Sequence, residues 1–123
     1  MTGEVGYIEI GTGDAGITSL FFADLFNWPF HAMGDKGDGW FETPGIKAGL
    51  HGNDTGYGTV VYFRVTDIEA AAARVRELGG KVEELGVDEP GFGRFYNCRD
   101  PQDVRFGLIQ PSALRRQVTA PAA

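Results

Sequence analysis

The feature that most constrains the fold of this chain is an internal repeat. The stretch "GYIEIGTGD" alternates apolar and polar residues, and it leads through glycines into "AGITSLFFADLFNW", where apolar residues recur at helical spacing. About 55 residues later, "GTVVYFRV" alternates in the same way and leads into the helical pattern of "DIEAAAARVRELGG". The sequence therefore predicts a strand followed by a helix twice over.

Signals for helix ends support both predicted helices. Asp14 has the side chain of an N-cap for the first helix. Thr66 and Glu69, three residues apart, fit a capping box for the second helix, which the glycines at 79 and 80 end. Apolar residues form a stripe at helical spacing in both helices: Ile17, Phe21, Leu25 and Trp28, widened by Phe22 and Phe26, and then Ile68, Ala72, Val75 and Leu78.

Short strand candidates separated by turn formers follow each helix. They are centred on "PFHAM", "GWFET" and "IKAGLHG" in the first copy and on "KVEEL", "GRFYNC" and "VRFGLIQ" in the second. The chain is therefore predicted to be one α+β domain over residues 1–123, with module one at about 5–53, module two at about 57–110 and a flexible tail at 111–123. A single copy cannot cover its own sheet, so the two modules are expected to pack together.

Alternation assigns the residues of the two leading strands to opposite faces. Ile8 and Ile10 mark the apolar face of the first strand, and Val61, Phe63 and Val65 mark that of the second. Aligning the two copies of the repeat makes three pairs of positions equivalent: Tyr7 and Tyr62, Glu9 and Arg64, and Val5 and Val60.

Charge and composition exclude several classes of partner. The net charge is -6, and the sequence has no cluster of Lys and Arg that would form a basic patch. The chain therefore repels phosphate backbones and anionic lipid. We therefore expect neither nucleic acid nor membrane as a partner, and the absence of a signal peptide or of ~20 consecutive apolar residues predicts a cytoplasmic protein. Cys98 is the only cysteine, which excludes an internal disulfide and a cysteine-built zinc site.

Three segments of the chain resemble the vicinal oxygen chelate superfamily, which includes glyoxalase, bleomycin-resistance and extradiol-dioxygenase proteins. They are "YIEI...FFADLFNW", "VVYFRVTDIEAAAARVRELGGKV" and "GRFYNCRDPQDVRFGLIQP", the last with Asp103 where the family often has glycine. The resemblance implies two βαβββ modules whose mixed sheets curve into an open barrel around a cavity, with the helices outside. Tyr7, Glu9, Tyr62 and Arg64 would then face the cavity.

The same resemblance raises the question of a metal. Members that depend on a divalent ion hold it with residues on the first and last strands of each module, and these positions fall on Val5, Gly49, Val60 and Gly107. None of the four has a side chain that donates to a metal. We therefore expect no metal and no cofactor.

Eight residues are candidates for contact with a small-molecule ligand. Glu9 and Arg64 are a charged pair that can orient a polar ligand, and His51 is the proton-transfer candidate of its region. Arg94 and Tyr96 share one face of "GRFYNC", and the sequence leaves open whether that face points inward. The full set is Tyr7, Glu9, Lys47, His51, Tyr62, Arg64, Arg94 and Tyr96.

The function expected from these residues is binding of a small aromatic or amphipathic molecule without a metal, as in the bleomycin-resistance branch. The alternative is an enzyme: a lyase or isomerase with Glu9 or His51 as base, or a dioxygenase-like protein with an atypical metal site. A third possibility is a dimeric scaffold whose own side chains fill the cavity. A homodimer is expected, because the Phe-rich stripe of the first helix and the small size favour burying surface between chains.

Overall fold

The structure of the chain, a computed structural model, describes residues 3–54, 56, 58–83, 87–89 and 93–111, with the backbone alone for 87–89. The chain divides into two compact units. The first unit is Tyr7–Val60, and the second is Met1–Gly6 together with Val61–Ala123. Each unit holds most of one predicted module, so the repeat seen in the sequence corresponds to a structural repeat.

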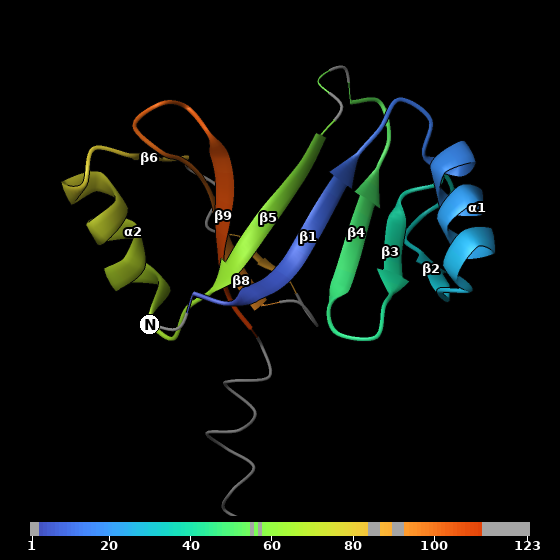
Figure 1. Cartoon of the computed structure of the whole chain (residues 1–123), viewed down its shortest axis with the longest axis horizontal. Helices are drawn as coiled ribbons and strands as arrows, with labels where there is room; N and C mark the ends of the chain where they lie inside the picture. The colour runs from blue at the N-terminus through green and yellow to red at the C-terminus, as the bar shows by residue number, and fades with distance from the viewer. Residues whose placement is uncertain (1–2, 55, 57, 84–86, 90–92, 112–123) are drawn as a thin grey trace, which may run out of the picture. The chain divides into compact units, whose positions relative to one another are not determined.

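The first unit has a strand, a helix and three further strands (Figure 1). The parallel pair of β1 with β4 joins the ends of the module, and antiparallel pairs add β3 and then β2, giving the order β2-β3-β4-β1. The elements are β1 (Val5–Gly11), α1 (Ala15–Phe26), β2 (Phe30–Ala32), β3 (Gly39–Glu42) and β4 (Lys47–His51).

The second unit repeats this arrangement. Its first strand pairs in parallel with its last, and the order β5-β9-β8-β6 corresponds strand for strand to that of the first unit read in reverse. The elements are β5 (Gly58–Arg64), α2 (Ile68–Glu77), β6 (Lys81–Val82), β7 (Val87–Glu89), β8 (Gly93–Arg99) and β9 (Arg105–Gln110). The α+β class and the two βαβββ modules are thus confirmed. Strand β7, which pairs with β8, is not among the strands predicted from the sequence.

The offset between the two copies differs from the prediction by two residues. β1 begins at Val5 and β5 at Gly58, and both strands and the helices that follow are 53 residues apart. The structural equivalents are therefore Glu9 and Tyr62, so the predicted alignment of Glu9 with Arg64 is wrong. A shift of two residues leaves every side chain on the same face of a strand, whereas a shift of one would exchange the faces.

The helix starts follow the same offset. Asp14 caps α1, and its Oδ1 accepts a hydrogen bond from the Ile17 N–H at 3.2 Å. Asp67 caps α2 by accepting from the Ala70 N–H at 3.1 Å, so the predicted capping box of Thr66 and Glu69 is not the one used. At an N-cap, aspartate is as good an acceptor of the backbone hydrogen bond as threonine. With Asp67 as the cap, α2 begins one residue later than the cap at Thr66 would place it.

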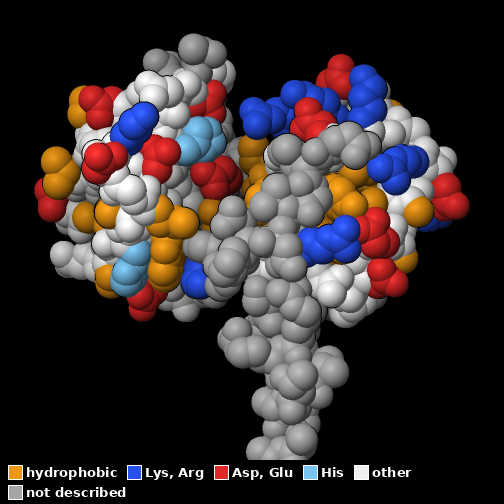
Figure 2. Space-filling view, turned by 180° about the vertical axis from the view of Figure 1, so that it is seen from behind, with side chains coloured by type: hydrophobic (Ala, Val, Ile, Leu, Met, Phe, Trp, Pro, Cys, Tyr) orange, Lys and Arg blue, Asp and Glu red, His pale blue; other side chains and the backbone are white. Residues whose placement is uncertain are grey.

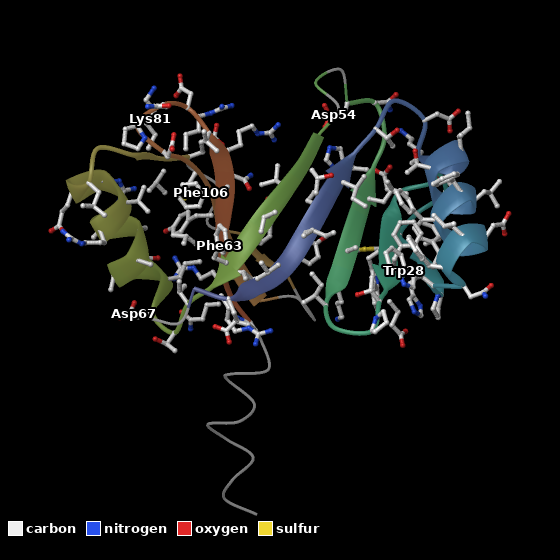
Figure 3. All side chains as sticks on the ribbon, in the orientation of Figure 1. Trp28, Asp54, Phe63, Asp67, Lys81 and Phe106 are labelled. Atoms are coloured by element: carbon white, nitrogen blue, oxygen red, sulfur yellow. The ribbon has the colours of Figure 1, made fainter. Side chains whose placement is uncertain are left out.

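Each helix packs on one face of its own sheet, where the hydrophobic core of each unit lies. Ile8 and Ile10 contact the core of the first unit and Val65 belongs to that of the second, as the alternation predicted. Trp28 and Phe106, labelled in Figure 3, lie beside these cores. The buried members are Ala15, Phe41, Ala48 and Leu50 in the first unit, and Val65, Ile68, Ala71, Cys98 and Leu108 in the second.

The apolar stripes predicted on the helices are only partly buried. In α1 the side chains of Ile17, Phe21 and Leu25 are exposed, while Ala15 and Phe22 take part in the core. In α2, Leu78 is exposed at the C-cap, whereas Ile68 and Ala72 are buried. Within the described part of the chain, neither helix has the length and apolar character needed to cross a lipid bilayer.

Candidate functional site

The candidate site lies on the face of the first unit's sheet that is turned away from α1. Because Ile8 and Ile10 point into the core, the alternation along β1 turns Tyr7 and Glu9 to the other side. In the parallel pair, Tyr7 lies beside Lys47, Glu9 beside Gly49 and Gly11 beside His51. We call this side the polar face; it also carries Trp40 and Glu42 of β3 and His31 of β2, which follow the same register.

A chain of hydrogen bonds connects four side chains of the polar face. The Tyr7 hydroxyl donates to Glu9 Oε1 at 2.7 Å, and His51 Nδ1 lies 2.7 Å from Glu9 Oε2. On the other side of the imidazole, His51 Nε2 lies 2.9 Å from Asp54 Oδ2. We call these four residues the Glu9 network. Ionised carboxylates only accept, so both contacts are satisfied together when both ring nitrogens carry protons.

The two carboxylates shift the titration of His51. Partial burial is the largest single influence and acts to lower the pKa of His51. The hydrogen bonds to Glu9 and Asp54, together with the negative charges of both groups, outweigh it and raise the pKa above the ordinary 6.5. The network therefore favours the imidazolium, which is the form that holds both carboxylates.

The loop after β4 brings Asp54 to the imidazole. Its backbone is attached to the turn between β1 and α1, because the Asp54 N–H donates to the Thr12 carbonyl at 3.0 Å and the Asn53 N–H to the Gly13 carbonyl at 3.1 Å. Asn53 adopts a positive φ of 55°, which turns the chain back over the end of β4. Asp54 is labelled at this end of the sheet in Figure 3.

Two glycines give the Glu9 network its room. A Cβ added at Gly49 would overlap the Tyr7 hydroxyl and Glu9 Oε1, and a Cβ added at Gly11 would overlap the Asp54 carboxylate. These side chains therefore lie flat against the sheet, over backbone that only glycine leaves uncovered. The network remains accessible: the side chains of His51, Glu9 and Asp54 keep 40%, 23% and 19% of their surface exposed.

A second group of side chains lies towards the edge of the same face. The His31 ring stacks on the Trp40 indole with centroids 4.2 Å apart, and the Lys47 ammonium lies 4.6 Å from the centre of the indole. His31 Nε2 also lies 2.8 Å from Glu42 Oε1. Figure 2 shows both histidines on the surface of this unit with acidic side chains beside them.

The corresponding face of the second unit is different. Tyr62 is buried, with 5% of its surface exposed, although it points away from α2. The Tyr62 hydroxyl donates to Asn97 Oδ1, and its ring meets Phe95 edge to face with centroids 5.8 Å apart. This tyrosine has the contacts of a core residue, whereas Val61 and Phe63 on the helix side are only half-buried.

The remaining predicted site residues have partners inside the second unit. Arg64 lies 3.8 Å from the Glu4 carboxylate. Arg94 and Tyr96 lie on the helix side of β8: Arg94 forms an ion pair with Glu69 of α2, and the Tyr96 hydroxyl donates to the same carboxylate at 2.9 Å. The two are therefore on the face opposite to Tyr62, which answers the question of their direction that the sequence left open. The hydrogen bond to Glu69 raises the pKa of Tyr96.

Two of the positions that the family resemblance assigns to a metal, Gly49 and Gly107, are covered by side chains of their own unit. The space above Gly49 is taken by Tyr7 and Glu9, and the space above Gly107 by the ring of Tyr62. In the observed register the equivalent of Val60 is Tyr7 rather than Val5, so a phenol replaces an aliphatic side chain at one position. Among the described residues, no three His, Cys, Asp or Glu side chains are arranged to hold an ion.

Sequence reasoning missed four members of the polar face: Asp54, Trp40, Glu42 and His31. Asp54 follows His51 by three residues in "HGND", a spacing that brings the two together only because the loop turns back. Trp40 alternates with the buried Phe41 in β3, and the pairing of Trp40 with Gly49 could have indicated its side.

Comparison with known proteins identifies relatives in sequence and in fold. The chain is 40% identical over 52 residues to "Putative glyoxylase CFP32" of Mycobacterium tuberculosis, covering 42% of this chain and 20% of that protein. It is 26% identical over 127 aligned positions to "Anthracycline biosynthesis protein DnrV" of Streptomyces peucetius, covering 86% of this chain and 46% of that protein. No family model matches the chain.

Among solved structures, methylmalonyl-CoA epimerase of Streptomyces coelicolor shares the fold. The TM-score is 0.67 at 18% identity, over 92% of this chain and 97% of that one. The resemblance to the vicinal oxygen chelate superfamily is thereby confirmed. The chain spans less than half the length of the curated relatives it matches.

Proposed function

We propose that the chain binds a small aromatic or amphipathic molecule on the polar face of the first unit, without a metal. The observation that carries this proposal is the Glu9 network. Four side chains from β1, β4 and the following loop are connected by hydrogen bonds over glycines that leave them room, and they remain accessible.

The chemistry of the polar face indicates the class of ligand. Tyr7 is half-buried and offers a flat apolar ring, to which an aromatic ring or an alkyl chain can bind. Lys47 supplies a positive charge beside it, and Glu9 supplies a carboxylate already oriented by two donors. A ligand with a planar body and one or two polar substituents matches these groups.

A thermal-shift screen of small aromatic metabolites in the presence of EDTA tests the proposal. A ligand at 100 times its Kd should stabilise the protein by ~2.7 kcal/mol. Tyr7→Phe should weaken that ligand by about tenfold through a lost hydrogen bond to the network. Tyr62→Phe is the matched control, since the Tyr62 hydroxyl is bonded to Asn97, and it should leave the affinity unchanged. Equal losses in the two variants, or binding that EDTA abolishes, would contradict the proposal.

Acid–base catalysis is the second candidate, and the position of His51 favours it. An imidazolium between two carboxylates, one of them bonded to a phenol, can pass a proton along the network. Such a site suits an isomerase or epimerase, in which Glu9 would accept a proton from the ligand. NMR of a ligand found in the screen, recorded in D₂O, tests this: exchange of a carbon-bound proton that Glu9→Gln abolishes would establish catalysis.

A further inference from the structure

The hydrogen bonds of the Glu9 network leave acceptors, and not donors, for a ligand. The Tyr7 hydroxyl donates its proton to Glu9 Oε1, and the two ring nitrogens of His51 face Glu9 Oε2 and Asp54 Oδ2. The donors of the network are therefore engaged inside it. A carboxylate can accept about four hydrogen bonds, so Glu9, with one of these contacts on each oxygen, can accept more.

The other two carboxylates of the polar face are less suited to bind a ligand. Asp54 Oδ1 accepts a hydrogen bond from the Gly56 N–H at 2.8 Å, and Asp54 Oδ2 lies 2.9 Å from His51 Nε2. The Glu42 side chain is 59% exposed and pairs with His31, so water competes for its oxygens. A hydrogen bond from a ligand therefore has the largest effect at Glu9.

Glu9 lies next to a flat apolar surface. Its side chain is 23% exposed, and the half-buried Tyr7 ring is held beside it by the hydrogen bond of 2.7 Å. Both side chains lie over the backbone of Gly49. A ligand ring that stacks on Tyr7 brings its substituents within reach of a partly sheltered carboxylate, where a hydrogen bond is stronger than in open water.

The charge of the first unit disfavours an anionic ligand. Residues 7–60 contain seven Asp and Glu but only two Lys and no Arg. Lys47, on the polar face, already lies over the Trp40 indole and pairs in register with Glu42. A ligand with a carboxylate or phosphate group would therefore meet a repulsive field, whereas an uncharged ligand would not.

We propose that the polar face of the first unit takes an uncharged aromatic molecule whose hydroxyl group donates a hydrogen bond to Glu9. This inference rests on the proposed binding function and narrows it to one class of ligand. A phenol has both features, a flat ring and a donor. An aryl ether of the same shape lacks the donor, and an aryl carboxylate adds a charge of the disfavoured sign.

A titration with matched probes tests this inference. Phenol, anisole and benzoate are added in turn to the ¹⁵N-labelled full chain, and the Kd is read from the chemical shift of the Gly49 amide, with the Gly107 amide as the reference in the second unit. Phenol should bind at least about tenfold more tightly than anisole, because anisole cannot donate to the charged group, and benzoate should bind most weakly. Anisole binding as tightly as phenol, or benzoate binding most tightly, would overturn the inference and leave the proposed function intact. No shift at Gly49 with any of the three probes would overturn both.

Two variants test the role of Glu9. Glu9→Gln should remove most of the preference for phenol over anisole, because the amide also offers a donor to the ether oxygen. Glu69→Gln is the matched control: Glu69 also accepts from a tyrosine hydroxyl, that of Tyr96 at 2.9 Å, but it lies in the second unit, so this variant should keep the preference. Loss of the preference in both variants, or in neither, would overturn the assignment to Glu9.

The absorbance of 4-nitrophenol gives a readout that is independent of affinity. In the second unit, the hydrogen bond to the Glu69 carboxylate raises the pKa of Tyr96. Glu9 should likewise hold a bound nitrophenol in its protonated form, so the wild type should reduce the visible absorbance of the phenolate, and Glu9→Gln should not. Unchanged or increased phenolate absorbance, while the probe shifts the Gly49 amide, would overturn the inference, because the site would then not act as an acceptor.

Discussion

The two modules have the same strand order but use equivalent positions for different purposes. Glu9 in the first unit and Tyr62 in the second lie beside Gly49 and Gly107, which the register makes equivalent. In the first unit a carboxylate lies over the glycine and joins an accessible hydrogen-bond network. In the second unit an aromatic ring lies over the glycine and is buried.

Because of this difference, we expect the position in the second unit to contribute to the stability of the fold and the position in the first unit to contribute to binding. A buried aromatic ring against a glycine contributes to the free energy of folding, since it removes apolar surface from water. A partly exposed carboxylate bonded to a histidine and a phenol contributes little to that free energy, but it keeps polar groups available to a ligand. The two units thus share one arrangement of strands. In the first unit the equivalent position belongs to the candidate site, and in the second unit it belongs to a buried, packed aromatic ring.

The strongest test of this comparison removes each tyrosine of the leading strands. Tyr62→Ala should lower the free energy of unfolding by ~3 to 5 kcal/mol, because a buried ring is replaced by a cavity and Asn97 loses its partner. Tyr7→Ala should cost ~1 kcal/mol, since Tyr7 is only half-buried. Urea unfolding of both variants measures the difference. Equal costs would show that the faces of the two units do not differ as described.

A smaller effect is expected when the glycines are replaced. Gly107→Ala should cost ~1 to 3 kcal/mol, because the new methyl group overlaps the buried ring of Tyr62. Gly49→Ala should cost less than ~1 kcal/mol, since Tyr7 and Glu9 meet the methyl group with the ends of flexible side chains and can move.

The same two variants separate the roles of the units in binding. Displacing Glu9 should weaken any ligand of the polar face, so Gly49→Ala should reduce affinity more than Gly107→Ala does. A thermal-shift titration of both proteins measures this, and the reverse order would contradict the assignment of the site.

The smallest effect is the pH dependence that His51 gives to stability. Its pKa in the folded chain is raised above the 6.5 of an unfolded histidine. The stabilisation is therefore fully present below about pH 6.5 and is lost as the pH rises through the folded value. Urea midpoints of the wild type should fall relative to those of His51→Gln between about pH 6 and about pH 9. A difference that grows with pH instead would mean that the neutral imidazole is the bound form.

The sequence was sufficient to predict every element except β7, and the faces of the leading strands, because alternation is a strong local signal. It was not sufficient for the offset between the copies, since a period of two is satisfied equally by 53 and 55. The aspartates at 14 and 67, which cap the two helices, contain the information that resolves it. Thr66 obscured this signal because it fits a capping box one residue earlier.

The faces of β8 and α1 could not be predicted locally. In β8, Arg94 and Tyr96 alternate with Phe95 and Asn97, so both faces carry one aromatic and one polar residue, and only the pairing of Tyr96 with Leu108 fixes the assignment. In α1 apolar residues surround the whole helix, so periodicity does not show which side meets the sheet. The Glu9 network depends on a loop that turns back, which spacing along the chain does not reveal.

The parallel pair that closes each module has a consequence for folding during synthesis. Tyr7 pairs with Lys47 and Tyr62 with Gly107, so each sheet is completed by its last strand, some forty residues after its first. Contacts between such distant residues form slowly, because the intervening chain must be ordered first. The first unit can complete its sheet as soon as β4 has left the ribosome, while the second must wait for β9. The half of the chain that carries the candidate site is therefore the first able to form, before the half that contributes the buried tyrosine exists in full.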